Sequence, residues 1–61
     1  MKFTAERLFE IAEEEYSEAG LTATPEGAGT WAMESAGQEH EDEAEVREEI
    51  RGYIAAEKEV D

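Results

Sequence analysis

The chain has 61 residues and carries 18 acidic side chains against five basic ones, which gives a net charge of −13 at pH 7. A chain of this length forms one domain, 1–61, and buries only about 60% of the surface that its unfolded form exposes. It contains no apolar run long enough for a signal peptide or a membrane span, so we expect a soluble, cytoplasmic protein. The negative charge disfavours direct binding to nucleic acid or to a membrane and favours binding to strongly basic protein surfaces.

The first predicted element is a helix over about 4–19. Thr4 is a suitable N-cap, because its hydroxyl can accept a hydrogen bond from a free backbone N–H of the first turn. The apolar side chains of this segment recur at helical intervals and fall in one broad arc: Ala5, Leu8, Phe9, Ile11, Ala12, Tyr16 and Ala19. Gly20 suits the position after the helix, where a left-handed backbone ends it and Leu21 completes a Schellman-type closure.

The segment 21–35 predicts a β-hairpin. Its larger apolar residues alternate with polar or small ones, as in half-buried strands: Leu21, Ala23, Trp31 and Met33. We therefore expect strands near 21–24 and 30–35, with these four side chains facing the helices. The residues 25–29 contain one proline and two glycines and would supply the turn. An alternative interpretation keeps 22–30 as an irregular loop and leaves only one strand.

A second helix is predicted over about 41–59. Its apolar residues fall on one face at the spacing of an amphipathic helix: Val46, Ile50, Tyr53, Ile54 and Val60. The expected fold is therefore α+β, a small two-layer α-β-β-α domain with two acidic helices packed on the hairpin. Trp31, the largest side chain in the chain, should be buried against the helices.

Both predicted helices carry rows of carboxylates at i, i+4 spacing. On the first helix the row is Glu6, Glu10, Glu14 and Glu18, with Glu13 beside it, and on the second it is Glu41, Glu45 and Glu49, with Glu48 beside it. An i+4 step covers about 6 Å of a helix, close to the roughly 7 Å between successive phosphates that we estimate from their rise along a DNA strand. The candidate partner-binding residues are therefore Glu10, Glu13, Glu14, Glu18, Glu41, Glu45, Glu48 and Glu49.

The remaining charges have simpler interpretations. Arg47, Arg51 and Lys58 form a basic edge on the second helix, which we expect to neutralise part of a neighbouring element. Glu15 and Glu57 each interrupt an apolar arc, and either is a boundary residue held by an arginine or a part of a partner surface. Crowded carboxylates raise one another's pKa, so the sequence predicts a fold that is more stable at mildly acidic pH.

The chain contains no recognisable catalytic motif. The chain has no cysteine and a single histidine, His40, which stands among Glu39, Glu41 and Asp42. We interpret this stretch as a solvated helix start, because the ligand spacing of a calcium loop is missing. A Ser/His/Asp set assembled from this chain lacks the spacing of an activated nucleophile. We therefore predict no catalytic residue, no metal site and no cofactor, and a protein that is not an enzyme.

Three explanations of the charge remain open. The protein is a DNA mimic that occupies a basic nucleic-acid-binding cleft, a small regulatory or antitoxin-like partner that wraps a basic protein, or a halophile-type acidic domain with no mimicry. Halophilic surfaces typically recruit aspartate as well as glutamate and spread both evenly. Here the only aspartates are Asp42 and Asp61, and the glutamates run in rows.

In size, charge and layout the chain resembles the small acidic anti-CRISPR proteins encoded by phages, several of which mimic DNA. The resemblance covers the whole chain and includes no sequence motif, so no residue is carried over from it. It implies a monomeric inhibitor in the cytoplasm of a bacterial host cell that blocks target-DNA (PAM) recognition by a type I CRISPR surveillance complex. The implied partner is a basic DNA-binding protein such as the PAM-recognising large subunit of a type I-C complex.

Overall fold

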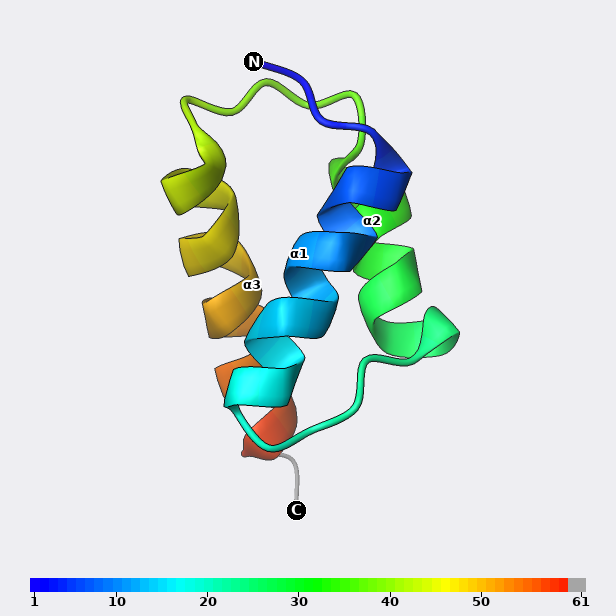
Figure 1. The fold of residues 1–61 in the computed structure, drawn as a ribbon, viewed down its shortest axis with the longest axis vertical. Coiled ribbons are helices and arrows are strands. Elements are labelled where there is room, and N and C mark those ends of the chain that lie inside the picture. Colours follow the sequence, from blue (N-terminus) through cyan, green and yellow to red (C-terminus); the bar gives the residue numbers. More distant parts are fainter. Residues whose placement is uncertain (60–61) are drawn as a thin grey trace.

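The computed structural model describes residues 1–59, and in this range the chain forms helices and no β-strand. The elements follow the order α1 (Ala5–Glu18), the π-helical turn η1 (Pro25–Gly29), α2 (Thr30–Ser35) and α3 (Glu43–Lys58). Helix α1 packs on both of the other α-helices and lies between them, with η1 and α2 on one side and α3 on the other (Figure 1). The predicted α+β class is therefore wrong, and the described chain is all-α.

Helix α1 confirms the first predicted helix and both of its ends. The hydroxyl of Thr4 accepts a hydrogen bond from the backbone N–H of Arg7 at 3.1 Å. At the other end Gly20 adopts a φ of 78°, in the left-handed region that suits glycine. The backbone N–H of Leu21 then donates to the carbonyl of Tyr16 at 2.8 Å, which is the long hydrogen bond of the predicted Schellman closure.

The predicted hairpin is wrong because 25–35 is helical from end to end. Thr24 caps this segment, and its hydroxyl accepts a hydrogen bond from the backbone N–H of Gly27 at 3.1 Å. Pro25 occupies the first helical position, where its missing N–H costs nothing. A threonine, a proline and then an acidic residue in the first turn form a helix-start signal, although proline and glycine in the same segment are also typical of a turn.

The residues that α2 and η1 bury follow the helical period. They are Ala28, Trp31, Ala32 and Ser35. The alternation of Trp31 with Met33 was therefore misleading: Trp31 is buried as predicted, whereas Met33 leaves 74% of its surface exposed. Leu21, also predicted to face inward, is 38% exposed. The short apolar stretch fitted a strand or a helix segment equally well, and only its packing partners decide between them.

Helix α3 confirms the second predicted helix, but it begins at Glu43 rather than near Glu41. Asp42 is its N-cap, and its carboxylate accepts a hydrogen bond from the backbone N–H of Glu45 at 3.0 Å. Its buried residues are Val46, Ile50 and Ile54, in agreement with the predicted apolar face, while Tyr53 is 39% exposed. Val60, predicted on the same face, lies outside the described residues.

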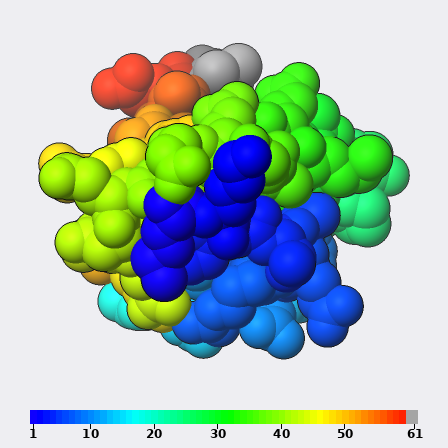
Figure 2. Space-filling view, turned by 90° about the horizontal axis from the view of Figure 1, so that it is seen from above, coloured from blue at the N-terminus to red at the C-terminus, as the bar shows by residue number. Residues whose placement is uncertain are grey.

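The first residues of the chain lie against the segment 36–42 that connects α2 to α3. The backbone N–H of His40 donates to the carbonyl of Met1 at 2.8 Å, and Lys2 forms an isolated antiparallel bridge with Glu39. Figure 2 shows the N-terminal residues, in dark blue, resting on the yellow-green residues of this connection. These contacts tie the two irregular segments together at one end of the helices.

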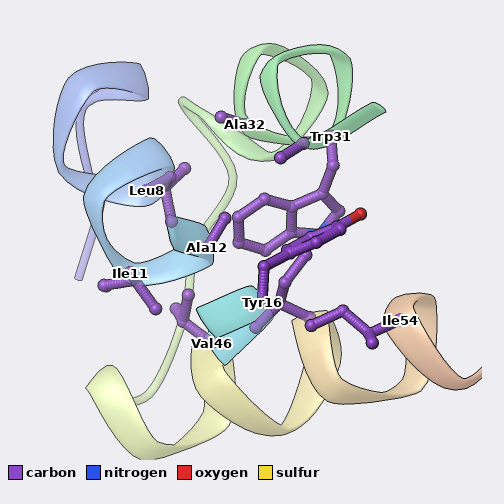
Figure 3. Packing of buried hydrophobic residues seen from close by; sticks show 10 residues of the cluster. Leu8, Ile11, Ala12, Tyr16, Trp31, Ala32, Val46 and Ile54 are labelled. Carbon is purple, nitrogen blue, oxygen red and sulfur yellow. The ribbon is translucent and has the colours of Figure 1, made fainter. Parts of the chain in front are cut away.

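The core fills the space between the three α-helices. It consists of Leu8, Ile11, Ala12 and Tyr16 from α1, Ala28, Trp31 and Ala32 from η1 and α2, and Val46, Ile50 and Ile54 from α3. The indole of Trp31 lies among the three helices, next to Ala12 and Tyr16 (Figure 3). Its Nε1 is buried and has no hydrogen-bond partner among the described residues.

We predict that the Trp31→Ala variant loses about 3–5 kcal/mol of unfolding free energy, because a large aromatic side chain leaves the core. The matched control is Met33→Ala, which should change stability by less than about 0.5 kcal/mol. Both free energies can be measured by chemical denaturation followed by circular dichroism. In a hairpin both side chains would face inward, so comparable losses in the two variants would contradict the helical structure of 30–35.

Candidate functional site

The eight predicted partner-binding residues are all exposed, and they belong to two separate parts of the chain. The set on α1 comprises Glu10, Glu13, Glu14 and Glu18. The set at α3 comprises Glu41, Glu45, Glu48 and Glu49. In the first set, Glu10 pairs with Arg7 of α1 and Glu14 pairs with Arg47 of α3. Glu45 and Glu49 instead contact the 36–42 connection and the end of α2. The candidate site is therefore an acidic surface in two parts.

Two members of the α1 set already form ion pairs within the chain. Glu10 lies 3.3 Å from Nη1 of Arg7, and Glu14 lies 2.8 Å from Nη2 of Arg47. Glu13 and Glu18 make no ion pair with any side chain of residues 1–59. The outer side of α1 therefore keeps part of its predicted charge free for a partner.

The row predicted on the second helix is shorter in the structure. Glu41 precedes the N-cap of α3 and belongs to the connection, and its backbone N–H donates to Oε2 of Glu45 at 3.2 Å. Glu45 and Glu49 therefore continue the row along α3 without Glu41. Glu48 is exposed beside them and has no ion-pair partner among residues 1–59.

The basic edge of α3 packs along α1, as predicted for Arg47 and Arg51. Glu15 is 4% exposed, with one carboxylate oxygen 2.8 Å from Nη1 of Arg47 and the other 2.7 Å from Nε of Arg51. Glu43 continues this chain of contacts, because it lies 3.3 Å from Nε of Arg47 and 2.5 Å from Nη2 of Arg7. We call these five residues the seam network. It confirms that Glu15 is a boundary residue held by arginines.

Glu57, the other residue that interrupts an apolar arc, has a different partner. Its carboxylate accepts a hydrogen bond from the hydroxyl of Tyr16 at 2.5 Å. Burial, and then the hydrogen bond to Glu57, raises the pKa of Tyr16. Glu57 itself is exposed, so this hydrogen bond connects a surface carboxylate to the buried side chain of Tyr16.

The seam network reverses the expected pKa direction for two carboxylates. The hydrogen bond from Arg51, followed by that from Arg47, holds the pKa of Glu15 below its usual range although burial opposes the shift. Arg7, followed by Arg47, lowers the pKa of Glu43 in the same way. Crowding among carboxylates would raise both values, so the arginines dominate at the seam.

His40 is buried, and the prediction of a solvated helix start is wrong at this residue. The imidazole is 3% exposed and packs edge-to-face on Phe3, with ring centroids 5.8 Å apart. Its Nδ1 faces the carboxylates of Glu45 and Glu49. Sequence reasoning missed this packing because it depends on the N-terminal residues folding back over the connection.

The structure also contains a shallow groove of about 310 Å³ between the C-terminal halves of α1 and α3. Its lining comprises Glu15, Glu18, Ala19, Arg51, Ile54, Ala55 and Lys58. Charges of both signs meet in this groove, so it does not present the single-sign field that would concentrate a charged ligand. Within residues 1–59 no three metal-ligating side chains converge on one point, and no helix is long and apolar enough to cross a bilayer.

Comparison of this chain with protein-family models, with curated proteins and with solved structures finds no match.

We predict that Glu15→Gln lowers the unfolding free energy at neutral pH by about 1–2 kcal/mol. The variant loses charge-assisted hydrogen bonds at a buried carboxylate, and the exposure of Arg51 limits the loss. The stability that Glu15 and Glu43 contribute is present above the unfolded glutamate pKa of about 4.3 and is lost as pH falls through their lower folded values. The unfolding free energy of the parent should therefore fall in acid more steeply than that of Glu15→Gln.

The matched control is Glu13→Gln, because Glu13 is exposed on the same helix without an ion-pair partner in the described range. Its acid profile should match that of the parent. Urea denaturation at a series of pH values measures all three proteins. Parallel acid profiles for the parent and Glu15→Gln would contradict a stabilising seam network.

Proposed function

We propose that the protein is a DNA mimic that occupies the basic DNA-binding surface of a nucleic-acid-binding protein. The observation that carries this proposal is the pairing of the arginine side chains. Arg7, Arg47 and Arg51 bind carboxylates of their own chain at the seam of α1 and α3. Most of the exposed carboxylates outside the seam network, among them Glu13, Glu18 and Glu48, therefore have no arginine partner within residues 1–59, and they leave the surface strongly acidic.

The size and charge of the protein support the same proposal. The longest dimension of the described chain is 34 Å, which is the length of about one turn of B-DNA. Over that length B-DNA carries about 20 phosphate charges. The protein carries a net charge of −13, so its charge per unit length is of the same order as that of the duplex. A cleft that attracts DNA would attract this protein for the same electrostatic reason.

Each exposed carboxylate would act as a phosphate surrogate that accepts charge-assisted hydrogen bonds from arginine or lysine. Such complementarity speeds association and weakens with added salt. The partner class is a basic DNA-binding protein in the bacterial cytoplasm. Following the resemblance to phage anti-CRISPR proteins, we propose the PAM-recognising subunit of a type I CRISPR surveillance complex as the first target to test.

The test begins with capture of partners from a bacterial lysate by the tagged protein, at low and at high salt. A DNA-displacement titration on the captured partner and on a purified type I complex then measures competition. We expect displacement that weakens steeply as salt increases. If the protein and DNA bind the same partner together without affecting each other, the DNA-mimic proposal is wrong.

Three variant sets that each remove four charges locate the contact. One set replaces Glu10, Glu13, Glu14 and Glu18 by glutamine, the second replaces Glu41, Glu45, Glu48 and Glu49, and the control set replaces Glu26, Glu34, Glu39 and Glu59. We expect at least one of the first two sets to weaken displacement by about 100-fold, which corresponds to about 2.7 kcal/mol. The control set should weaken it only a few-fold, through the lower net charge.

Glutamine keeps the hydrogen-bonding oxygen of each side chain, so all three sets should stay folded, as circular dichroism can verify. Equal losses in all three sets would mean that net charge acts without a defined contact surface. No loss in any set, combined with a large loss on truncating the exposed Met33 or Tyr53, would instead support an antitoxin-like partner that binds through apolar contacts.

A further inference from the structure

His40 is held between three parts of the chain. Its ring packs on Phe3 from the N-terminal segment, and its Nε2 lies 3.4 Å from the carbonyl oxygen of Ser35 at the end of α2. Its Nδ1 faces α3, 3.5 Å from Oε1 of Glu45 and 4.0 Å from Oε2 of Glu49. The buried ring thus has a neighbour in each of these three parts of the chain.

The two carboxylates beside His40 are each held by a second group. The other oxygen of Glu45 accepts the backbone N–H of Glu41 at 3.2 Å, and the other oxygen of Glu49 accepts the hydroxyl of Ser35 at 3.5 Å. The side chains nevertheless remain 44% and 45% exposed. Each carboxylate is therefore fixed on its inner side and open on its outer side.

The other candidate carboxylates lack this combination. Glu10 and Glu14 are oriented by arginines, which already occupy part of their hydrogen-bonding capacity. Glu13, Glu18 and Glu48 have neither an ion pair nor a side-chain hydrogen bond among residues 1–59 that would restrict their rotamers. A side chain that is already ordered loses less conformational entropy when a partner binds it. Glu45 and Glu49 are thus both oriented and free of any arginine.

Resting on the DNA-mimic function proposed above, we propose that His40 is a positioning residue that orders Glu45 and Glu49 as the main contact for arginine or lysine side chains of the partner. The imidazole acts through the two carboxylates and does not itself touch the partner. This assignment selects the α3 part of the acidic surface over the α1 part.

The first measurement uses the parent protein alone. Side-chain NMR relaxation of the glutamate methylene groups should give higher order for Glu45 and Glu49 than for Glu48, the matched control on the same helix. We also expect nuclear Overhauser contacts from the His40 ring to the side-chain methylene groups of Glu45 and Glu49. If Glu45 and Glu49 are as mobile as Glu48, the positioning role is wrong, whatever the behaviour of any variant.

Two substitutions of His40 separate positioning from simple structural support. An asparagine amide nitrogen occupies the place of Nδ1, so His40→Asn places an N–H donor toward the two carboxylates. A glutamine amide reaches the place of Nε2, so His40→Gln keeps only the contact with Ser35. Both variants remove the ring and should lose similar stability. We expect the order of Glu45 and Glu49 to fall to that of Glu48 in His40→Gln and to persist in His40→Asn.

Binding is measured with an oligo-arginine peptide as a probe of a basic surface. His40→Gln should weaken its binding about threefold to tenfold, the range expected when a partner must order one or two side chains on binding. His40→Asn should bind within about twofold of the parent. Equal weakening in both variants would overturn the positioning role. Ordered carboxylates in a parent that fails to displace DNA from any partner would overturn the DNA-mimic function and leave the role of His40 standing.

Discussion

The fold depends on the buried carboxylate of Glu15, which joins α1 to α3 through Arg47 and Arg51. A charged group at 4% exposure costs free energy unless it is paired, and here both of its oxygens have a guanidinium partner. Removing either arginine would leave the carboxylate partly unpaired inside the interface. The pairing therefore holds α3 along α1. It also directs the guanidinium groups of Arg47 and Arg51 toward α1.

The pairing of the arginines with carboxylates of their own chain links stability to the proposed function. Arg47 contacts Glu14, Glu15 and Glu43, and Glu43 is shared with Arg7. The planar fork of an arginine can bind several carboxylates at once, whereas a lysine ammonium acts as a single point charge. Few cations can thus hold the two helices together against the repulsion of a net charge of −13. The arginines used at the seam are then already paired with carboxylates of the same chain, and the exposed surface keeps an excess of acidic side chains.

The two long helices could be predicted from the sequence because their signals are local. Thr4 and Gly20 mark the ends of α1, and the helical spacing of the apolar residues indicates the helix between them without any tertiary contact. The segment 25–35 could not be read in the same way, since Trp31 and Met33 fit a strand and a short helix alike. The signal that separates the two is Thr24 followed by Pro25, a helix cap and a first helical residue.

The candidate site was only partly predictable. The spacing of residues along a helix indicates which carboxylates are exposed, but not which of them form ion pairs with other parts of the chain. Periodicity correctly placed Glu10 and Glu14 on an exposed side of α1, but their arginine partners became visible only when the helices were packed. His40 illustrates the opposite case: its polar neighbours in sequence suggested solvent, yet Phe3 folds over it from the other end of the chain. The same contact places the ring beside Glu45 and Glu49. The net charge of this protein is therefore set by its composition. Which carboxylates are paired or held in place is set by contacts between segments far apart in the sequence.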